Sequence, residues 1–555
     1  MHKFLLALLI IPTIILAETE EDYSSGRVRL SNIMSNEETG VAAYNKKYLK
    51  FAETRNLTND LNIAQMAAFF ECKTLMGESF IAETLKYPLG LKGENPILTN
   101  RQDAIKALVE NPNLKKEVEQ LLMLAKQAEQ QVIQLMSDIF IGKSCPELQQ
   151  LELIKRDYPF LYPINNFFIK SPNARTISNV FNYLAFVSLL SFTVISAVNK
   201  FVFGGVYFGC LSALSLYGIY HDYATACEKR SKLHSLNKLI NISEKIEKLC
   251  VRHDIKKQFK MADIDNLKGI ELVQKLKHSR YKSKHSTFFS TAAVHTLLYE
   301  VYEQDKNLAP IFTIIAEMDA YNAIANKILE SQSQKNKFCF VEFIENAKPT
   351  IKATGFWNIL VQDAVTNNIA ETKNIILTGA NKGGKSTAIR ALLQNIVLAQ
   401  SFGIAAAQSL KITPYDVIHS FINISDDILN GTSLFSAEVK RAQEILQKIK
   451  SLEPNCKYFF ALDELFTGTA AEEGEKCAYE FVKRISEFKD IQFIYATHFN
   501  KLKDLGKDNQ FCINYKVDAP IKNNEGKLVY PFTLSQGYND INVAMDLARE
   551  ADLFA

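Results

Sequence analysis

The fold of the C-terminal part of the chain can be inferred from residues 374–387, which read Asn374-Ile375-Ile376-Leu377-Thr378-Gly379-Ala380-Asn381-Lys382-Gly383-Gly384-Lys385-Ser386-Thr387. An apolar run of strand length passes directly into a glycine-rich turn, and a helical pattern follows the turn. Strand, glycine-rich loop and helix in this order form a phosphate-binding loop, in which backbone N–H groups and a helix N-terminus face a phosphate chain. The stretch therefore predicts an α/β nucleotide-binding domain.

The residues of this loop have distinct predicted roles. We expect all residues from Gly379 to Thr387 to surround the phosphates, because glycines let the backbone approach them closely. Lys385 is expected to reach the β and γ phosphates, and the Ser386 hydroxyl to bind Mg²⁺. ATP with Mg²⁺ is the expected ligand.

Two further strands end in polar residues that suit the same chemistry. The apolar run 458–462 is followed by Asp463 and Glu464, and the run 492–496 is followed by Thr497 and His498. Because the carboxyl ends of parallel strands meet at one edge of a sheet, these side chains should lie near the phosphate loop.

The acid pair and the histidine then have separate predicted roles. Asp463 would hold Mg²⁺, Glu464 would act as general base for the attacking water, and His498 would contact the γ phosphate. Two structural alternatives stand beside these roles, namely acids that merely decorate a helix N-terminus and a histidine that is simply packed.

The remaining sequence indicates six segments. Residues 337–555 combine strand-like and helical runs and form the predicted α/β domain. Residues 57–175 and 221–336 carry apolar residues at helical spacing, which predicts two halves of an all-α region. Residues 18–56 are polar and indicate a loose leader. Segments 1–17 and 176–220 are hydrophobic.

The two hydrophobic segments predict a membrane location. Residues 1–17 have the charged start and apolar middle of a signal peptide or short N-terminal anchor. Residues 180–220 carry Lys200 as their only formal charge and predict a transmembrane hairpin with both flanks in the cytoplasm. A signal peptide would place the C-terminal domain outside, so the two segments conflict. The expected need for ATP favours a cytoplasmic domain, and a buried helical pair is the alternative to the hairpin.

Composition sets broad limits on the class of protein. Of the 555 residues 47% are hydrophobic and 23% are charged, which is typical of a folded chain with two or three domains. The net charge of +3 does not by itself indicate nucleic-acid binding. Nine cysteines are scattered without close pairs, so we expect neither a structural metal nor a disulfide framework.

A segment between the phosphate loop and the acid pair carries a family resemblance. Residues 426–438 read Asp-Asp-Ile-Leu-Asn-Gly-Thr-Ser-Leu-Phe-Ser-Ala-Glu. With Gly431, Ser433, Phe435 and Glu438 at matching places, this segment resembles the signature of the MutS family of ATPases. The resemblance implies a homodimer in which the signature residues of one chain face the nucleotide held by Lys385 of the other.

Further residues extend the resemblance. Gln408 is similar to the family's glutamine before the signature, residues 468–469 resemble its D-loop, and Phe356 or Trp357 is the candidate for stacking on adenine. Residues 76–112 look like the opening of the family's lever domain. In two respects the sequence departs from the pattern. It has no room before residue 60 for a mismatch-recognition domain, and the predicted hairpin occupies the place of the DNA-gripping clamp.

The sequence thus predicts a membrane-anchored, MutS-like dimeric ATPase that couples its nucleotide state to movement of the helical levers. DNA remains open as a partner. The alternative is a nucleotide-gated membrane scaffold with little hydrolysis and no DNA substrate. Loss of turnover on Glu464→Gln would favour the ATPase.

Overall fold

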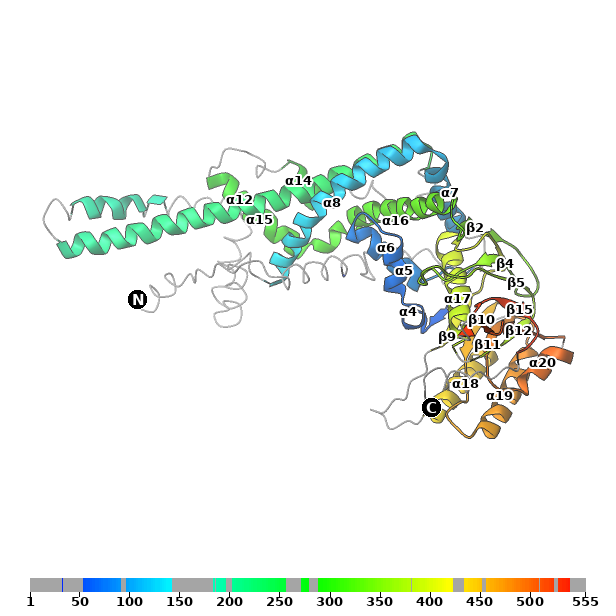
Figure 1. The fold of residues 1–555 in the computed structure, drawn as a ribbon. Helices are drawn as coiled ribbons and strands as arrows, with labels where there is room; N and C mark the ends of the chain where they lie inside the picture. The colour runs from blue at the N-terminus through cyan, green and yellow to red at the C-terminus, as the bar shows by residue number, and fades with distance from the viewer. Residues whose placement is uncertain are drawn as a thin grey trace. The chain divides into compact units, whose positions relative to one another are not determined.

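The computed structural model describes residues 32, 53–90, 96–141, 183–184, 186–195, 202–255, 271–278, 288–380, 382–422, 434–451, 456–508, 510–523 and 528–539 (Figure 1). The signal-like segment 1–17 lies outside these residues, as does most of the predicted leader 18–56. The chain divides into two compact units. Unit 1 comprises residues 1–34, 124–243 and 264–312, and unit 2 comprises residues 35–123, 244–263 and 313–555.

Unit 1 is helical throughout its described residues. Two long helices, α8 (Pro112–Ile141) and α12 (Val202–Arg252), contribute residues to both units. Unit 1 also holds α14 (Glu271–His278), α15 (Phe288–Glu303) and the 3₁₀ turn η2 (Asp305–Leu308). An ion pair of 2.8 Å joins Lys275 of α14 to Glu300 of α15, but it lies near the surface and contributes little to stability.

The predicted transmembrane hairpin is wrong, and so is the membrane location based on it. Among the residues that the structure describes, no helix combines the length and the apolar character needed to cross a membrane. The second predicted span does not end near residue 220, because residues 202–252 form one helix of 51 residues that continues into a charged half.

A buried carboxylate joins two helices in the helical part of unit 2. This part comprises α4 (Leu57–Asp60), α5 (Ile63–Phe69), α6 (Leu75–Lys86), α7 (Pro96–Glu110) and most of α16 (Ala309–Ser331). Thr74 caps α6 by accepting a hydrogen bond of 3.0 Å from the Gly77 N–H. Asp319 of α16 accepts hydrogen bonds of 2.7 Å from both the backbone N–H and the hydroxyl of Thr74. The N-terminus of α6 is therefore anchored on α16.

The main sheet of unit 2 has seven strands in the order β1-β9-β10-β11-β6-β12-β15. These are β1 (Glu53–Arg55), β9 (Val417–Phe421), β10 (Tyr458–Asp463), β11 (Ile491–Ala496), β6 (Asn374–Thr378), β12 (Cys512–Val517) and β15 (Leu534–Gln536). All neighbours are parallel except β15, which is antiparallel to β12. The prediction of an α/β C-terminal domain is confirmed.

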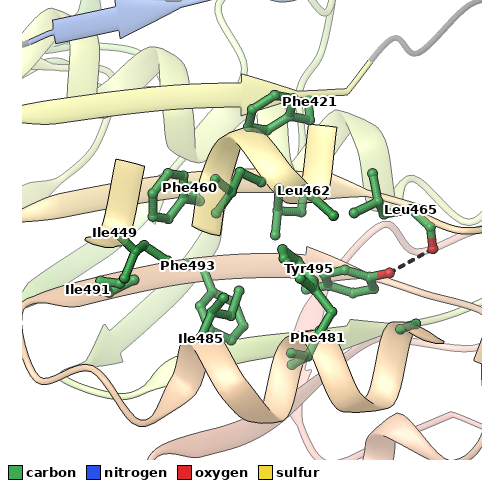
Figure 2. Packing of buried hydrophobic residues seen from close by; sticks show 14 of the residues in the cluster. Phe421, Ile449, Phe460, Leu462, Leu465, Phe481, Ile485, Ile491, Phe493 and Tyr495 are labelled. Atoms are coloured by element: carbon green, nitrogen blue, oxygen red, sulfur yellow. Dashed lines mark hydrogen bonds between the residues drawn. The ribbon is translucent and has the colours of Figure 1, made fainter. Parts of the chain in front are cut away.

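Four helices accompany this sheet, namely α17 (Lys385–Phe402), α18 (Leu434–Lys450), α19 (Ala471–Ser486) and α20 (Leu502–Asp508). Figure 2 shows the core on one face, where Phe460 and Phe493 of adjacent strands meet Ile449 of α18 and Ile485 of α19. On the strands, the residues between these face the other way, where α17 packs against β10 and β11. Burial on both faces explains why β10 and β11 are apolar apart from Gln492 and the terminal Asp463.

Smaller sheets complete unit 2. A four-stranded sheet has the order β3 (Glu342–Phe343), β8 (Ser409–Ile412), β4 (Ile351–Phe356) and β5 (Asn367–Glu371). Two strand pairs join β2 (Cys339–Phe340) with β7 (Ile404–Ala405), and β13 (Ile521–Lys522) with β14 (Leu528–Val529).

Strand β1 and the short helix after it fasten the helical part of unit 2 to the main sheet. The strand lies beside β9, and the sequence did not predict it. At the end of α4, buried Asp60 accepts hydrogen bonds from the Ser420 hydroxyl at 2.7 Å and from the Ile422 N–H at 3.2 Å. Residues that lie more than 350 positions apart in the chain therefore meet at one edge of the sheet.

Candidate nucleotide-binding site

Three neighbouring strands bring the predicted site residues to one edge of the sheet. Strands β10, β11 and β6 are consecutive and parallel, with Asp463 opposite Ala496 and Ala496 opposite Leu377. The phosphate loop follows β6, the acid pair ends β10, and His498 follows β11 by two residues. Local apolar patterns determine where each strand ends, and the parallel register brings the three ends together.

The phosphate loop folds around its own lysine. Lys385 begins α17, is 6% exposed, and donates hydrogen bonds from Nζ to the carbonyls of Gly379 at 3.1 Å and Ala380 at 3.4 Å. A Cβ at Gly383 would lie 2.8 Å from the Ala380 oxygen, and Gly384 has a φ of 100°. Both positions therefore require glycine. Asn381 lies outside the described residues.

The lysine, the glutamate and the histidine are in direct contact. His498 Nε2 lies 2.9 Å from Lys385 Nζ and 2.7 Å from Glu464 Oε1, and Lys385 Nζ lies 3.6 Å from Glu464 Oε1. One ring nitrogen cannot accept a hydrogen bond from the lysine and donate one to the glutamate at the same time. If Nε2 carries a hydrogen, His498 donates a hydrogen bond to Glu464; if it does not, His498 accepts one from Lys385.

The pKa values of Lys385 and Glu464 are both lowered, but for different reasons. Burial lowers the pKa of Lys385, and the neighbouring Glu464 and Asp463 carboxylates partly oppose that shift. The hydrogen bond from His498 lowers the pKa of Glu464 more than burial raises it. Glu464 is therefore kept ionised, as a proton acceptor must be.

Asp463 and Ser386 fit a magnesium ion. Burial raises the pKa of Asp463, and a hydrogen bond from the Ser386 side chain opposes this shift. Asp463 Oδ1 is buried and has no hydrogen-bond partner among the described residues. A carboxylate and a hydroxyl are the oxygen ligands that Mg²⁺ prefers, and the unpartnered carboxylate oxygen is free to receive one.

The predicted adenine-stacking residues are both part of the protein core. Phe356 is fully buried and Trp357 is 7% exposed. Trp357 donates a hydrogen bond of 2.9 Å from Nε1 to the Lys337 carbonyl and packs edge-on against Phe338 at 5.3 Å. Gln408 is exposed, and its side chain lies against Gly355 of β4. The structure brings none of these three side chains into a described contact with Lys385, Asp463 or His498.

A residue that the sequence analysis missed lies against the phosphate loop instead. A Cβ at Gly384 would be 2.8 Å from the ring of Phe532, which is 44% exposed and stacks on Tyr530 with a centroid distance of 5.8 Å. Phe532 has a φ of 53°, which is unusual for a bulky residue. The Asn367 side chain holds this segment, with Nδ2 donating to the Phe532 carbonyl at 3.2 Å. No local sequence pattern points to Phe532, because more than 140 residues separate it from Gly384.

The predicted signature residues are described only in part. Gly431 and Ser433 lie outside the described residues. Phe435 packs at the edge of the core beneath the sheet. Glu438 is 1% exposed and accepts hydrogen bonds of 3.0 Å from the N–H groups of Thr467 and Gly468 in the same chain. Its carboxylate is therefore directed inward.

Comparison with known proteins locates a relationship in this part of the chain. Residues 375–554 match the family model "MutS domain V". The DNA mismatch repair protein MutS of Fusobacterium nucleatum is 32% identical over 183 residues, which cover 33% of this chain and 20% of that protein. MutS of Streptococcus pyogenes serotype M1 is 30% identical over 196 residues, which cover 35% of this chain and 22% of that protein.

The family model matches residues of the sheet-containing region. The chain spans about a fifth of the length of the curated relatives it matches. Strands β10 and β11, all of β6 after its first residue, and the residues at the carboxyl ends of the three strands lie inside the matched range, whereas residues 76–112 lie outside it. The C-terminal part of this chain is similar to domain V of MutS.

Proposed function

We propose that the C-terminal domain binds ATP with Mg²⁺ and hydrolyses it. The observation that carries this proposal is the contact among Lys385, Glu464 and His498 beside Asp463, at the end of a phosphate loop. Similarity to MutS domain V supports the same assignment.

In this proposal, separate residues bind the phosphates, the magnesium ion and the base. Backbone N–H groups from 379 to 387 bind the phosphates, and Lys385 pairs with the β and γ phosphates. Ser386 and Asp463 would hold Mg²⁺, which supplies positive charge against the charge that develops on the phosphate oxygens. Phe532, which lies beside the loop, replaces Phe356 and Trp357 as our candidate for contacting the base.

The hydrolytic step follows from the position of Glu464. A water molecule attacks the γ phosphorus, the bond from this phosphorus to the bridging oxygen breaks, and ADP and phosphate are formed. Glu464 accepts the proton that the water loses, and His498 holds the Glu464 carboxylate. Phosphates that bind Lys385 compete with the 3.6 Å Lys385–Glu464 pair, so nucleotide binding would free the glutamate for this role.

We further propose that the active form is a homodimer. Residues 426–438 resemble the MutS signature, and the proposed arrangement places Ser433 of one chain at the nucleotide of the other. Levers that move with the nucleotide state belong to the same proposal and rest on the resemblance of residues 76–112. The family match at residues 375–554 supports the ATPase part of this proposal, and DNA binding is not part of it.

The substitution Glu464→Gln tests the proposed hydrolysis. We expect the steady-state ATPase rate of the purified full chain to fall by about 100-fold or more, because a general base is lost. The affinity for ATP, measured by calorimetry, should stay within about threefold, since Glu464 does not bind the phosphates. Lys385→Ala should instead abolish binding.

Glu473→Gln provides the matched control, because Glu473 is an exposed glutamate in the first turn of α19 and lies outside the site. Its ATPase rate should equal that of the original chain. An ATPase rate that Glu464→Gln leaves unchanged would contradict the proposal and favour a protein that binds nucleotide without using this site for hydrolysis.

A further inference from the structure

The loop that carries the proposed general base has an unfavourable backbone conformation. We call residues 464–468 the acid loop; it lies between β10 and α19. Glu464 has a φ of 50° and Phe466 a φ of 72°, and neither residue is a glycine. Non-glycine residues in the left-handed region persist only where their surroundings hold them. The neighbours of the acid loop therefore determine where the Glu464 carboxylate lies.

Two of these neighbours act from the sheet and from α19. Tyr495 of β11 donates a hydrogen bond of 2.8 Å from its hydroxyl to the Leu465 carbonyl, as Figure 2 shows. Gly474 of α19 lies so close that a Cβ there would be 2.3 Å from the Phe466 carbonyl oxygen. These contacts position the first half of the acid loop.

The third neighbour is Glu438, which holds the second half of the acid loop. Its Oε1 accepts a hydrogen bond of 3.0 Å from the Thr467 N–H and one of 3.3 Å from the Thr467 hydroxyl. Its Oε2 accepts a hydrogen bond of 3.0 Å from the Gly468 N–H. A carboxylate that is 1% exposed and binds two consecutive backbone N–H groups forms a rigid, charge-assisted contact.

Glu438 also links this loop to a different functional segment. It lies in α18, which begins at Leu434, immediately after the proposed signature residue Ser433. Glu438 is thus about one helical turn from the start of α18. A displacement of this end of the helix would move the Glu438 carboxylate and, with it, the acid loop.

We propose that Glu438 is a positioning residue that holds Glu464 in place by binding the Thr467 and Gly468 amides within the same chain. This inference rests on the proposed ATPase function. The resemblance to the MutS signature placed Glu438 at the partner's nucleotide. In the present inference Glu438 acts instead on the acid loop of its own chain. A ligand at the signature end of α18 would consequently alter the rate of hydrolysis in the chain that carries that signature.

Glu438→Gln tests the inference, because glutamine has the same shape but offers only one acceptor oxygen to the two amides. We expect kcat for ATP hydrolysis to fall by about tenfold to a hundredfold, since a small misplacement of a catalytic group has effects of this size. The KM and the ATP affinity should change by less than about threefold. Glu438→Ala should be at least as slow, and Glu473→Gln should match the original chain.

A double substitution separates positioning from a direct role. If Glu438 acts through Glu464, the chain with both Glu438→Gln and Glu464→Gln should be no slower than the chain with Glu464→Gln alone. Multiplicative losses would overturn the inference, and so would a Glu438→Gln chain with unchanged kcat.

Hydrogen exchange gives a readout that does not depend on activity. In the original chain, the amides of Thr467 and Gly468 should exchange slowly, and Glu438→Gln should make them exchange at least about tenfold faster while the amides of β11 are unaffected. Unchanged exchange at these two amides would overturn the inference. If the original chain showed no ATPase activity, the proposed function would fail, while exchange would still report whether Glu438 holds the loop.

Discussion

At the scale of single residues, the candidate site brings Lys385, Glu464 and His498 into contact beside Asp463. The positive charge of Lys385 lies 3.6 Å from the Glu464 carboxylate, so these two charges partly compensate each other inside the site. Asp463 differs from them because one of its carboxylate oxygens is buried without a hydrogen-bond partner among the described residues. Unfavourable burial of this kind is common where function requires a charge.

Asp463→Asn should therefore stabilise the protein while removing its proposed activity. In the absence of nucleotide and magnesium, we expect the free energy of unfolding to rise by about 1 kcal/mol, because a neutral amide costs less to bury than a carboxylate. Magnesium-dependent ATP hydrolysis should fall by about 100-fold or more. Chemical denaturation and steady-state kinetics measure the two effects.

The pH dependence of this gain has a definite sign. Burial raises the pKa of Asp463, so its folded form binds a proton more tightly than its unfolded form does. While Asp463 is protonated, no charge has to be buried. As the pH rises through the raised pKa, Asp463 ionises and the buried charge lowers the free energy of unfolding. The advantage of Asp463→Asn should therefore grow with pH over that range.

A carboxylate with a lowered pKa serves as the control. Hydrogen bonds from Ser535 and Thr533 lower the pKa of Asp518, although burial acts in the opposite direction. Asp518→Asn should destabilise the protein above the acid range. A gain in stability from both substitutions would contradict this account of Asp463.

At the scale of secondary structure elements, helices α6 and α16 approach each other closely at Gly77. A Cβ at Gly77 would lie 2.5 Å from Asp319 Oδ2, which already accepts two hydrogen bonds from Thr74. The close approach of the two helices thus depends on glycine at position 77.

Gly77→Ala should reduce the free energy of unfolding by about 1–3 kcal/mol, because the added methyl group must displace the Asp319 carboxylate. Gly209→Ala in α12 is the matched control, since the nearest atom to its Cβ would be Thr193 Cγ2 at an ordinary 3.6 Å. That substitution should be neutral or stabilising, because alanine favours a helix over glycine. If both substitutions reduced the free energy of unfolding equally, the close contact between Gly77 and Asp319 would not explain the loss.

At the scale of the whole molecule, all the described residues of the candidate site belong to unit 2. Strand β1 and helices α4 to α7 fold with the main sheet in this unit, although they are distant from it in sequence. A ligand of the site should consequently act on the stability of unit 2.

Scanning calorimetry can test this assignment. In Glu464→Gln, ATP with Mg²⁺ at about 100 times its Kd should stabilise unit 2 by about 2.7 kcal/mol and raise the midpoint of its transition. The transition of unit 1 should shift by less. Adding Lys385→Ala should remove the effect of nucleotide, and equal shifts of both transitions would count against the assignment.

Sequence patterns were sufficient for the parts of the fold and site that depend on local order. Apolar runs that precede Gly379, Asp463 and His498 predicted three parallel strands with the candidate site residues at one edge. This was possible because the length and the end of a strand depend on its own residues. The resemblance of residues 76–112 to a lever domain stays a prediction. The hairpin prediction was wrong because apolar content over a short window does not show that residues 202–252 form one helix with a charged half.

The α/β class of the C-terminal domain could be inferred from the sequence alone, as could the order of its phosphate loop, acid pair and histidine. Three features became evident only from the folded chain: Glu438 is directed toward the Thr467 and Gly468 amides, Phe532 lies against the phosphate loop, and β1 joins the sheet. These contacts join segments between about 30 and more than 350 residues apart. Local propensity has no information about such contacts, because they form only when packing of the core brings the segments together.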